Sequence, residues 1–411
     1  MNILVSHPTG NANLRAAIAG IDSSKNLLEF HTCLATDLNS AWFRILPAKL
    51  RNEFLRRSFP ISQDKTVTHP TKELARLVLL KMGLTKWSQH EVGKFSTDQI
   101  YRSLDRDVSN RILKFGANVL DAVYAYEDGA LSTFKAARNI GISRLYDLPI
   151  GYWRSSRKLL QDEMDSHPEW AATLTGFKDS ESKLQRKDHE LQLADHIFVA
   201  SSFTRETLNE FPGELPPVHV IPYGFPEVGA KKHYSSLTGR KLKLLFVGGL
   251  SQRKGLYYLF EAIDDLEDKV ELTIVGRKPV PDCRALNQSL IKHKWIESLP
   301  HSDILRLMQE HDAFVFPSLF EGFGLVITEA MSQGVPVITT DRTCGPDIIT
   351  NGEDGWIINA GSTDEIKNAI ESILHEPEKL KMMGNAAQEK ARLRPWSKYG
   401  SELNEKIISV L

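Results

Sequence analysis

The chain has 411 residues, which is long enough for two domains of ordinary size, each with its own hydrophobic core. Lys and Arg total 51 and Asp and Glu total 52, so the formal net charge is -1 and no overall basic field exists to attract nucleic acid. The three cysteines are far apart and form no C-x-x-C pattern, which argues against a disulfide framework or a zinc site. The sequence begins in a strand-like run and contains no apolar stretch of membrane-spanning length. We therefore expect a cytoplasmic protein that does not bind nucleic acid.

The first half of the chain alternates strand-like and helical segments, with apolar strand signals at 3–6, 28–34, 122–126, 144–147 and 196–200. This alternation is typical of βαβ units with a parallel sheet. Prolines and a glycine at 218–226, followed by a polar stretch, predict the end of a domain. We therefore place an N-terminal Rossmann-like domain, which would bind the acceptor, at residues 1–226.

The second half restarts the same pattern. An apolar run at 242–247, which is typical of a buried strand, is followed by a predicted helix from Leu256. Further strand signals follow at 270–275, 313–316 and 335–339. We expect a second Rossmann-like domain at 227–393, which gives an α/β fold with two doubly wound sheets. Ligands of such sheets bind outside the carboxyl ends of the strands, so two facing domains would enclose a cleft.

Two carboxylates, Glu321 and Glu329, stand with seven residues between them in the stretch EGFGLVITEAMSQGVPVI. Gly322 and Gly324 break the preceding strand and 325–332 is predicted to be a helix, so Glu321 would lie in the turn and Glu329 on the helix. The amino end of a helix suits an anion such as pyrophosphate, whereas carboxylates suit hydroxyl donors such as ribose and hexose. Together these features indicate a nucleotide-sugar site. The alternative is a solvated loop residue and a helix-face residue, as in most pairs at this spacing.

This motif resembles the signature of the family 4 retaining glycosyltransferases, which have the GT-B fold. The resemblance implies that the two domains face each other across a cleft and that a C-terminal helix at 394–411 crosses back to the first domain. It also implies that a hexosyl group moves from a nucleotide diphosphate sugar to an acceptor hydroxyl without a metal ion or another cofactor. A glycan or lipid-linked glycan acceptor and a role in polysaccharide biosynthesis fit this reading. By the same resemblance, Glu321 would contact the donor sugar and Glu329 the ribose, and the backbone amides of Phe323, Gly324 and Leu325 would contact phosphate or sugar.

A glycine-containing loop at 248–255 joins a predicted strand to a predicted helix and carries Arg253 and Lys254. Glycines let the backbone approach a phosphate, and two cations would stabilise a departing nucleoside diphosphate more in the transition state than in the ground state. The loop is similar to the donor-phosphate loop of the family, in which an arginine often follows the first glycine. That place is Gly249 here, so we expect Arg253 to supply the missing charge. A solvated surface pair is the alternative if the loop is taken alone, and Gly276, in a turn that the family places near the nucleoside, is a weaker signal.

On the acceptor side, Tyr126 stands where the corresponding strand of the family ends in a histidine, and Glu127 and Asp128 follow it. A tyrosine can donate a hydrogen bond, but its ordinary pKa of about 10 makes it a poor base at neutral pH. Glu127 or Asp128 could substitute, and in retaining enzymes of this type the leaving phosphate oxygen itself takes the acceptor proton. Gly10, in the first strand-to-helix loop, would permit close approach of donor or acceptor, although an ordinary turn with an asparagine cap explains it equally well.

Three other patterns have plainer explanations. Asp105 and Asp107 form the one D-x-D of the sequence, but they fall in a predicted helix at 97–115, where we expect a solvated face and no metal site. Asp347 resembles an acidic turn of the family, and a carboxylate at a helix amino end explains it equally well. The segment 42–57 mixes aromatic and basic residues. A basic rim of the acceptor cleft or an ordinary surface helix explains that segment better than docking to the inner face of a membrane.

Two rival functions remain open at this level. A nucleotide-sugar epimerase or a sugar phosphorylase would use the same architecture, and the intact motif of two carboxylates argues against both. A non-catalytic nucleotide-sugar-binding protein is suggested by Tyr126 and Gly249, which replace two polar residues expected from the family.

Overall fold

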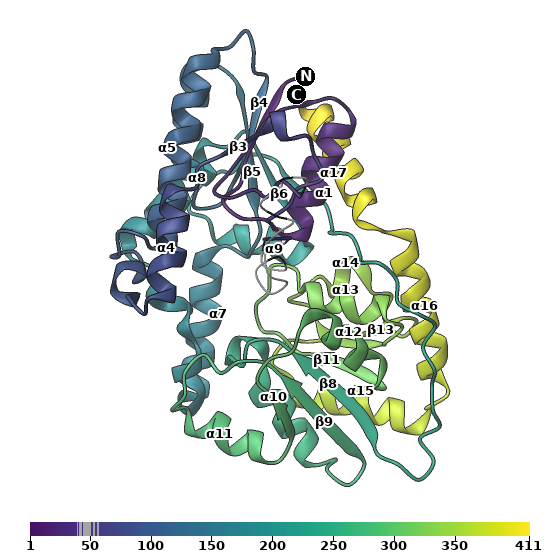
Figure 1. Ribbon diagram of the computed structural model, residues 1–411. Helices are drawn as coiled ribbons and strands as arrows, with labels where there is room; N and C mark the ends of the chain where they lie inside the picture. Colours follow the sequence, from purple (N-terminus) through teal and green to yellow (C-terminus); the bar gives the residue numbers. More distant parts are fainter. Residues whose placement is uncertain (39, 41–42, 44–50, 52–53, 56) are drawn as a thin grey trace.

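The computed structural model describes residues 1–38, 40, 43, 51, 54–55 and 57–411, and these residues form two lobes (Figure 1). Within them, the first lobe holds a seven-stranded sheet in the order β3-β2-β1-β4-β5-β6-β7. The second holds a six-stranded sheet in the order β10-β9-β8-β11-β12-β13. Every strand pair named in these two sheets is parallel. The predicted fold class is therefore confirmed.

The first lobe is built on strands whose side chains are mostly buried, as expected for a parallel sheet with helices packed around it. Its strands are β1 (Ile3–Ser6), β2 (Leu27–Thr32), β3 (Thr66–Thr68), β4 (Ala122–Tyr126), β5 (Ser143–Leu148), β6 (His196–Val199) and β7 (Val218–Val220). Its α-helices are α1 (Ala12–Ser23), α4 (Thr71–Lys81), α5 (Thr97–Phe115), α6 (Leu131–Ile140), α7 (Trp153–Ser166), α8 (Glu181–Leu193) and α9 (Ser202–Thr207). Short 3-10 turns are η1 (Gln63–Lys65), η2 (Thr85–Ser88), η3 (Pro168–Thr173), η4 (Thr175–Lys178) and η5 (Leu208–Glu210).

The second lobe repeats this plan. Its strands are β8 (Leu242–Val247), β9 (Val270–Val275), β10 (Lys294–Ile296), β11 (Ala313–Phe316), β12 (Val337–Thr340) and β13 (Gly355–Ile358). The 3-10 turn η6 (Gln252–Lys254) precedes the helices, which are α10 (Leu256–Asp264), α11 (Arg284–Ile291), α12 (His301–Gln309), α13 (Leu325–Ser332), α14 (Gly345–Ile348), α15 (Thr363–His375) and α16 (Lys379–Leu393). In each sheet the strand order reverses at one point, between β1 and β4 and between β8 and β11, and such points are where doubly wound sheets bind ligands.

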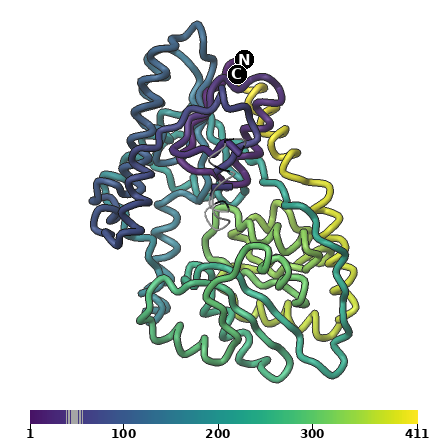
Figure 2. Tube along the Cα trace, in the orientation of Figure 1, coloured from purple at the N-terminus to yellow at the C-terminus, as the bar shows by residue number. Residues whose placement is uncertain are grey.

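The chain passes between the lobes twice, and the two crossings are bonded to each other. The amide of Phe225 donates to the carbonyl of Arg394 at 2.8 Å, and the Arg394 Nε donates to the Tyr223 carbonyl at 3.2 Å. Helix α17 (Trp396–Val410) then lies along α1, as the yellow end of the chain beside the purple start shows in Figure 2. A Cβ on Gly400 would stand 2.2 Å from the carbonyl oxygen of Ala16, so the two helices pack at backbone distance. The predicted return of the last helix to the first domain is confirmed.

The solvated face predicted for Asp105 and Asp107 is wrong at Asp105. Its side chain is buried, and its carboxylate accepts the backbone N–H groups of Ser132 at 2.7 Å and Thr133 at 2.8 Å. Those groups belong to the first turn of α6, where Ala130 stands at the cap position and has no side-chain acceptor, so Asp105 of α5 supplies one. Asp107 does face solvent.

The aromatic and basic segment 42–57 lies largely outside the described residues. Among the described ones, the structure contains no helix with both the length and the hydrophobicity needed to span a bilayer.

Candidate active site

A cavity of about 460 Å³ lies between the lobes, at the carboxyl ends of strands from both sheets. From the first lobe it is lined by Asn11, Asn13, Pro149 and Tyr223. The second lobe contributes Val247, Gly248, Gly249, Arg253, Lys254, Phe316, Glu321, Phe323, Gly324, Leu325 and Val326. The structure thus brings both predicted donor motifs, the glycine loop and the stretch after β11, to one cavity.

Two cations in this cavity share one carboxylate. Lys254 Nζ forms an ion pair with Glu321, and Arg253 Nη1 lies 3.4 Å from the same Glu321 oxygen while donating to the carbonyl of Phe320 at 2.5 Å. Burial lowers the pKa of both cations, and the charge of Arg253 lowers that of Lys254 further. When both cations are protonated, these three groups carry a net charge of +1, and an anionic ligand would stabilise the protonated form of Lys254.

The loop that carries the cations is fixed by its surroundings. Gly255 has φ 71°, and a Cβ there would stand 2.0 Å from the carbonyl oxygen of Pro317, so only glycine fits. Gln252 is buried, and its Nε2 donates to Glu163 Oε1 of α7 at 2.7 Å. Its backbone N–H donates to Thr173 Oγ1 at 2.9 Å. Because Glu163 and Thr173 belong to the first lobe, the loop is held from both sides of the cleft.

The glycines of this region have different roles. A Cβ on Gly249 would meet nothing within 4 Å, so there is room for a side chain at the position where the resemblance implied an arginine. A Cβ on Gly276 would stand 1.8 Å from the carbonyl oxygen of Gly248. Gly276 is absent from the cavity wall, and its missing side chain serves the close packing of two strand ends.

The turn after β11 packs against the first lobe and also lines the cavity. A Cβ on Gly322 would stand 2.1 Å from the carbonyl oxygen of Pro149, and the Gly322 carbonyl accepts hydrogen bonds from Ser201 Oγ at 2.6 Å and Thr204 Oγ1 at 2.9 Å. Gly324 has φ 92° and caps α13 without a side chain, which leaves the amino end of that helix at the cavity wall. This end is suited to phosphate oxygens.

Glu329 lies one turn further along α13 and is absent from the wall of this cavity. Burial raises its pKa to about 7. Its described charge partner is His301, whose Nδ1 is 3.8 Å from Glu329 Oε1. A half-buried carboxylate with so distant a partner gains from hydroxyl donors that reach it.

At the end of β4, Tyr126 packs against His7, with the ring centroids 4.1 Å apart. Burial raises the pKa of Tyr126 well above its ordinary value, so the phenol stays protonated and can donate a hydrogen bond but cannot act as a base. Burial lowers the pKa of His7 to about 3. The His7 Nδ1 accepts the Thr9 N–H at 3.2 Å, and Gly10 lines a separate cavity of about 210 Å³ beside this cluster.

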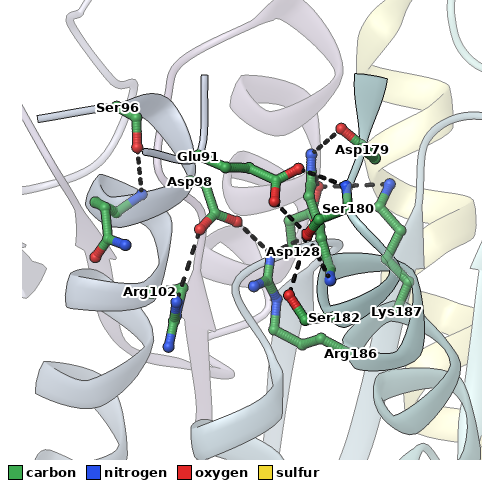
Figure 3. Close-up of polar contacts among 12 residues, drawn as sticks. Glu91, Ser96, Asp98, Arg102, Asp128, Asp179, Ser180, Ser182, Arg186 and Lys187 are labelled. Carbon is green, nitrogen blue, oxygen red and sulfur yellow. Dashed lines mark hydrogen bonds and ion pairs between the residues drawn. The ribbon is translucent and has the colours of Figure 1, made fainter. Parts of the chain in front are cut away.

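Glu127 and Asp128 are engaged elsewhere, in a network of charged groups that joins α8 to the end of β4 and to α5 (Figure 3). Glu127 is buried and forms an ion pair with Lys187 at 3.0 Å. Asp128 accepts from Arg186, which also pairs with Asp98 (Figure 3). Neither carboxylate lines the interlobe cavity.

The sequence motifs did not reveal the contribution of the first lobe. Asn13 Nδ2 donates to the Tyr223 hydroxyl at 3.0 Å, and both residues line the cavity although they are far apart in sequence. A buried asparagine on an otherwise apolar helix face was the available signal. Asp347 accepts the backbone N–H of Ser202 at 2.9 Å, so it ties α14 to the first turn of α9 across the two lobes.

Comparisons with known proteins agree with this geometry. Residues 231–390 match the family described as glycosyl transferases group 1. The capsular polysaccharide biosynthesis glycosyltransferase CapM of Staphylococcus aureus is 28% identical over 186 residues, which are 42% of this chain and 46% of that protein. The spore coat protein SA of Bacillus subtilis is 30% identical over 192 residues, 42% of this chain and 49% of that protein. The matched part spans less than half of either relative.

Solved structures align over the whole chain. Sucrose-phosphate synthase from Thermosynechococcus elongatus gives a TM-score of 0.67 at 15% identity, covering 100% of this chain and 99% of the other. HepE from Anabaena in complex with UDP gives 0.64 at 17% identity, covering 100% of both chains. At these identities the likeness concerns the fold. Residues 231–390 therefore resemble the glycosyl transferases group 1 family, and the chain as a whole has the GT-B fold.

Proposed function

We propose that the chain is a retaining, metal-independent glycosyltransferase that moves a hexosyl group from a nucleotide diphosphate sugar to an acceptor hydroxyl. The observation that carries this proposal is the pair of half-buried cations, Arg253 and Lys254, which share the single carboxylate of Glu321 in the cavity between the two lobes. A diphosphate would supply the missing negative charge. The UDP complex of HepE, a protein with the same fold, supports a nucleotide as the ligand class.

The cations would act mainly on the leaving group. Burial lowers the pKa of Lys254, and a nearby diphosphate would raise it again as negative charge develops on the leaving oxygen. The stabilisation is then larger in the transition state than in the ground state, which is the condition for catalysis. Glu321, released from Lys254, would accept hydrogen bonds from donor-sugar hydroxyls, and Glu329 would accept them from the ribose.

In this mechanism the bond from the anomeric carbon to the phosphate oxygen breaks, and the bond to the acceptor oxygen forms on the same face. The acceptor proton passes to the leaving phosphate oxygen, so no protein base is needed. Tyr126, which stays protonated, would donate a hydrogen bond to the acceptor or to the transferred sugar. If Tyr126→Phe and Glu127→Gln both leave turnover intact, the end of β4 has only a structural role.

The acceptor would bind to the first lobe, beside Gly10 and the end of β4. Names of relatives include a capsular polysaccharide glycosyltransferase and a phosphatidyl-myo-inositol mannosyltransferase, which favours a glycan or a lipid-linked glycan as acceptor and a cytoplasmic place of action. Polysaccharide biosynthesis is the corresponding pathway class.

The test has two stages. A thermal-shift screen against UDP, GDP, ADP and their sugars identifies the donor, because a ligand that binds the native state raises its apparent stability. Donor consumption is then measured with EDTA present, with and without glycan acceptors, and NMR of the product gives the anomeric configuration. No stabilisation by any nucleotide and no donor turnover would refute the proposal. Stabilisation without any turnover would favour the non-catalytic binding protein.

A further inference from the structure

Helix α4 and the segment after it carry their apolar side chains on the outside. Glu73 is the buried residue of α4, a helix that the structure describes in full. Val78 and Met82, one helical turn apart, are 56% and 66% exposed, and Val92 is 80% exposed. We call the exposed apolar residues of this region the α4 patch: Leu74, Val78, Met82, Leu84, Trp87 and Val92. Isolated exposed apolar residues are ordinary, but this many within one short segment indicate a surface that something else covers.

The polar side of α4 is the side that packs on the protein. Arg76 donates to both oxygens of Glu73, at 2.8 and 2.7 Å, and Arg57 lies 3.5 Å from the same carboxylate. Lys72 Nζ donates to the Gln99 carbonyl of α5 at 3.4 Å. Glu73 and Arg76 both belong to α4, so the polar contacts that reach other segments are those of Glu73 with Arg57 and of Lys72 with Gln99. The exposed apolar side chains of Leu74, Val78 and Met82 are left for solvent or a partner.

The segment that bears the rest of the patch is anchored to α8. The Ser180 backbone N–H donates to Glu91 Oε1 at 2.9 Å, and Figure 3 shows this contact next to Asp179. His90 Nε2 lies 2.9 Å from Asp179 Oδ1, and the Phe95 amide donates to the Trp87 carbonyl at 2.9 Å. These bonds hold Trp87 and Val92 outward on a fixed frame, so the exposure is a property of the fold.

Positive charge accompanies the patch. Between residues 71 and 94 there are five Lys and Arg and two Glu, so this segment has a net charge of 5 minus 2, or +3, in a chain with a net charge of -1. Lys81, Lys86 and Lys94 are exposed among the apolar residues. Both acidic residues are engaged, Glu73 with Arg76 and Glu91 with Ser180. An anionic surface would therefore complement the patch.

From these features we infer that the α4 patch docks the protein to an anionic lipid bilayer. The apolar side chains would enter the boundary between headgroups and acyl chains, Trp87 would lie at the headgroup level, and the lysines would contact anionic headgroups. A second copy of the chain fits less well, because a symmetric contact would bring Lys81 and Lys86 of both copies together. Lysine is also depleted at the centre of protein interfaces. This inference is independent of the proposed transfer reaction, since the patch contributes no residue to the interlobe cavity.

Co-sedimentation of the full chain with vesicles tests the inference. The vesicles are phosphatidylcholine alone or a mixture with phosphatidylglycerol, at low and high salt. We expect partitioning onto the anionic vesicles to exceed that onto neutral ones by about tenfold at low salt and to weaken at high salt. The triple variant Val78→Ser, Met82→Ser, Trp87→Ser and the double variant Lys81→Glu, Lys86→Glu should each lose at least about tenfold in partitioning.

A matched control distinguishes binding through the α4 patch from nonspecific binding through any exposed apolar side chain. The variant Ile291→Ser, Met382→Ser, Leu393→Ser removes equally exposed apolar side chains of the second lobe, and it should bind anionic vesicles like the parent protein. Unchanged thermal midpoints would show that all variants are folded. Absence of binding by the parent protein at low salt overturns the inference, as does equal binding by parent and patch variants. A dimer in light scattering that the triple serine variant abolishes, without vesicle binding, would instead assign the patch to self-association.

Discussion

Replacement of Glu329 by glutamine should remove a pH dependence from donor binding. Burial raises the pKa of this carboxyl from 4.5 to about 7, so in the empty site it is protonated below neutral pH. Hydroxyl groups of the donor ribose would donate to the ionised form and lower the pKa again. Donor binding should therefore strengthen as the pH rises through about 7 and release a proton below that pH.

The size of the effect follows from these two pKa values. If the donor returns the pKa to its ordinary range, affinity falls about 30-fold between about pH 8 and about pH 5.5, which corresponds to about 2 kcal/mol. Nucleotide sugars suit the measurement because their diphosphate does not titrate in this range. The stability of the donor-free protein should also depend on pH. Above about pH 7 the folded state holds a poorly solvated charge at Glu329, which Glu329→Gln removes, so the variant should be more stable than the parent protein there. At about pH 4, where the carboxyl is protonated in both folded and unfolded states, the difference should vanish.

Isothermal titration calorimetry in two buffers of different ionisation enthalpy measures both affinity and proton release. The parent protein should release up to one proton per donor at about pH 6, and Glu329→Gln should release none through this group. His301 Nδ1 lies 3.8 Å from Glu329 Oε1, so His301→Gln is the control and should keep the proton release. Identical pH profiles for the parent protein and Glu329→Gln would refute the assignment of Glu329 to the donor site.

Three other substitutions give further tests. Lys254→Met should weaken donor binding about 10- to 100-fold by calorimetry because a charge-assisted contact is lost, whereas the exposed Lys381→Met should not, and equal affinities would remove Lys254 from the site. Asp105→Ala leaves the backbone N–H groups of Ser132 and Thr133 in the first turn of α6 without their acceptor and should cost about 1–2 kcal/mol in urea unfolding, while Asp107→Ala should cost little; equal costs would contradict the capping role. Gly400→Val places a Cβ about where a carbonyl of α1 stands and should lower the thermal midpoint by several degrees, and an unchanged midpoint would show that the contact of α17 with α1 is loose.

The second lobe could be predicted further than the first because its chemistry is local in sequence. Glu321 follows a strand, glycines break the chain and α13 begins at once, so a single stretch supplies six of the fifteen residues of the cavity wall. Asn13 and Tyr223 escaped prediction because their meeting depends on the packing of loops that are distant in sequence. The short edge strands β3 and β10 have only three residues each, too few for a periodic signal.

Helices were misjudged for a different reason. Asp105 was expected to face solvent because charged residues on amphipathic helices usually do, but a neighbouring helix without a cap of its own required the carboxylate. On α4, hydrophobic periodicity alone would point the apolar face inward, whereas the buried contact is the Glu73 to Arg76 pair. In both helices the partner of a charged side chain decided its burial, and a single sequence does not name that partner.

The bonded crossings at Phe225 and Arg394 constrain how the protein can open. These crossings form one hinge between the lobes. The hydrogen bonds of Gln252 to Glu163 of α7 and to Thr173 of η3 form a second connection between the lobes. A rotation of one lobe about this hinge must break the hydrogen bonds of Gln252. Gln252 immediately precedes Arg253 and Lys254. If the proposed function is right, parting of the lobes would also free the cationic loop, so that release of the nucleoside diphosphate and entry of the next donor would depend on the same motion.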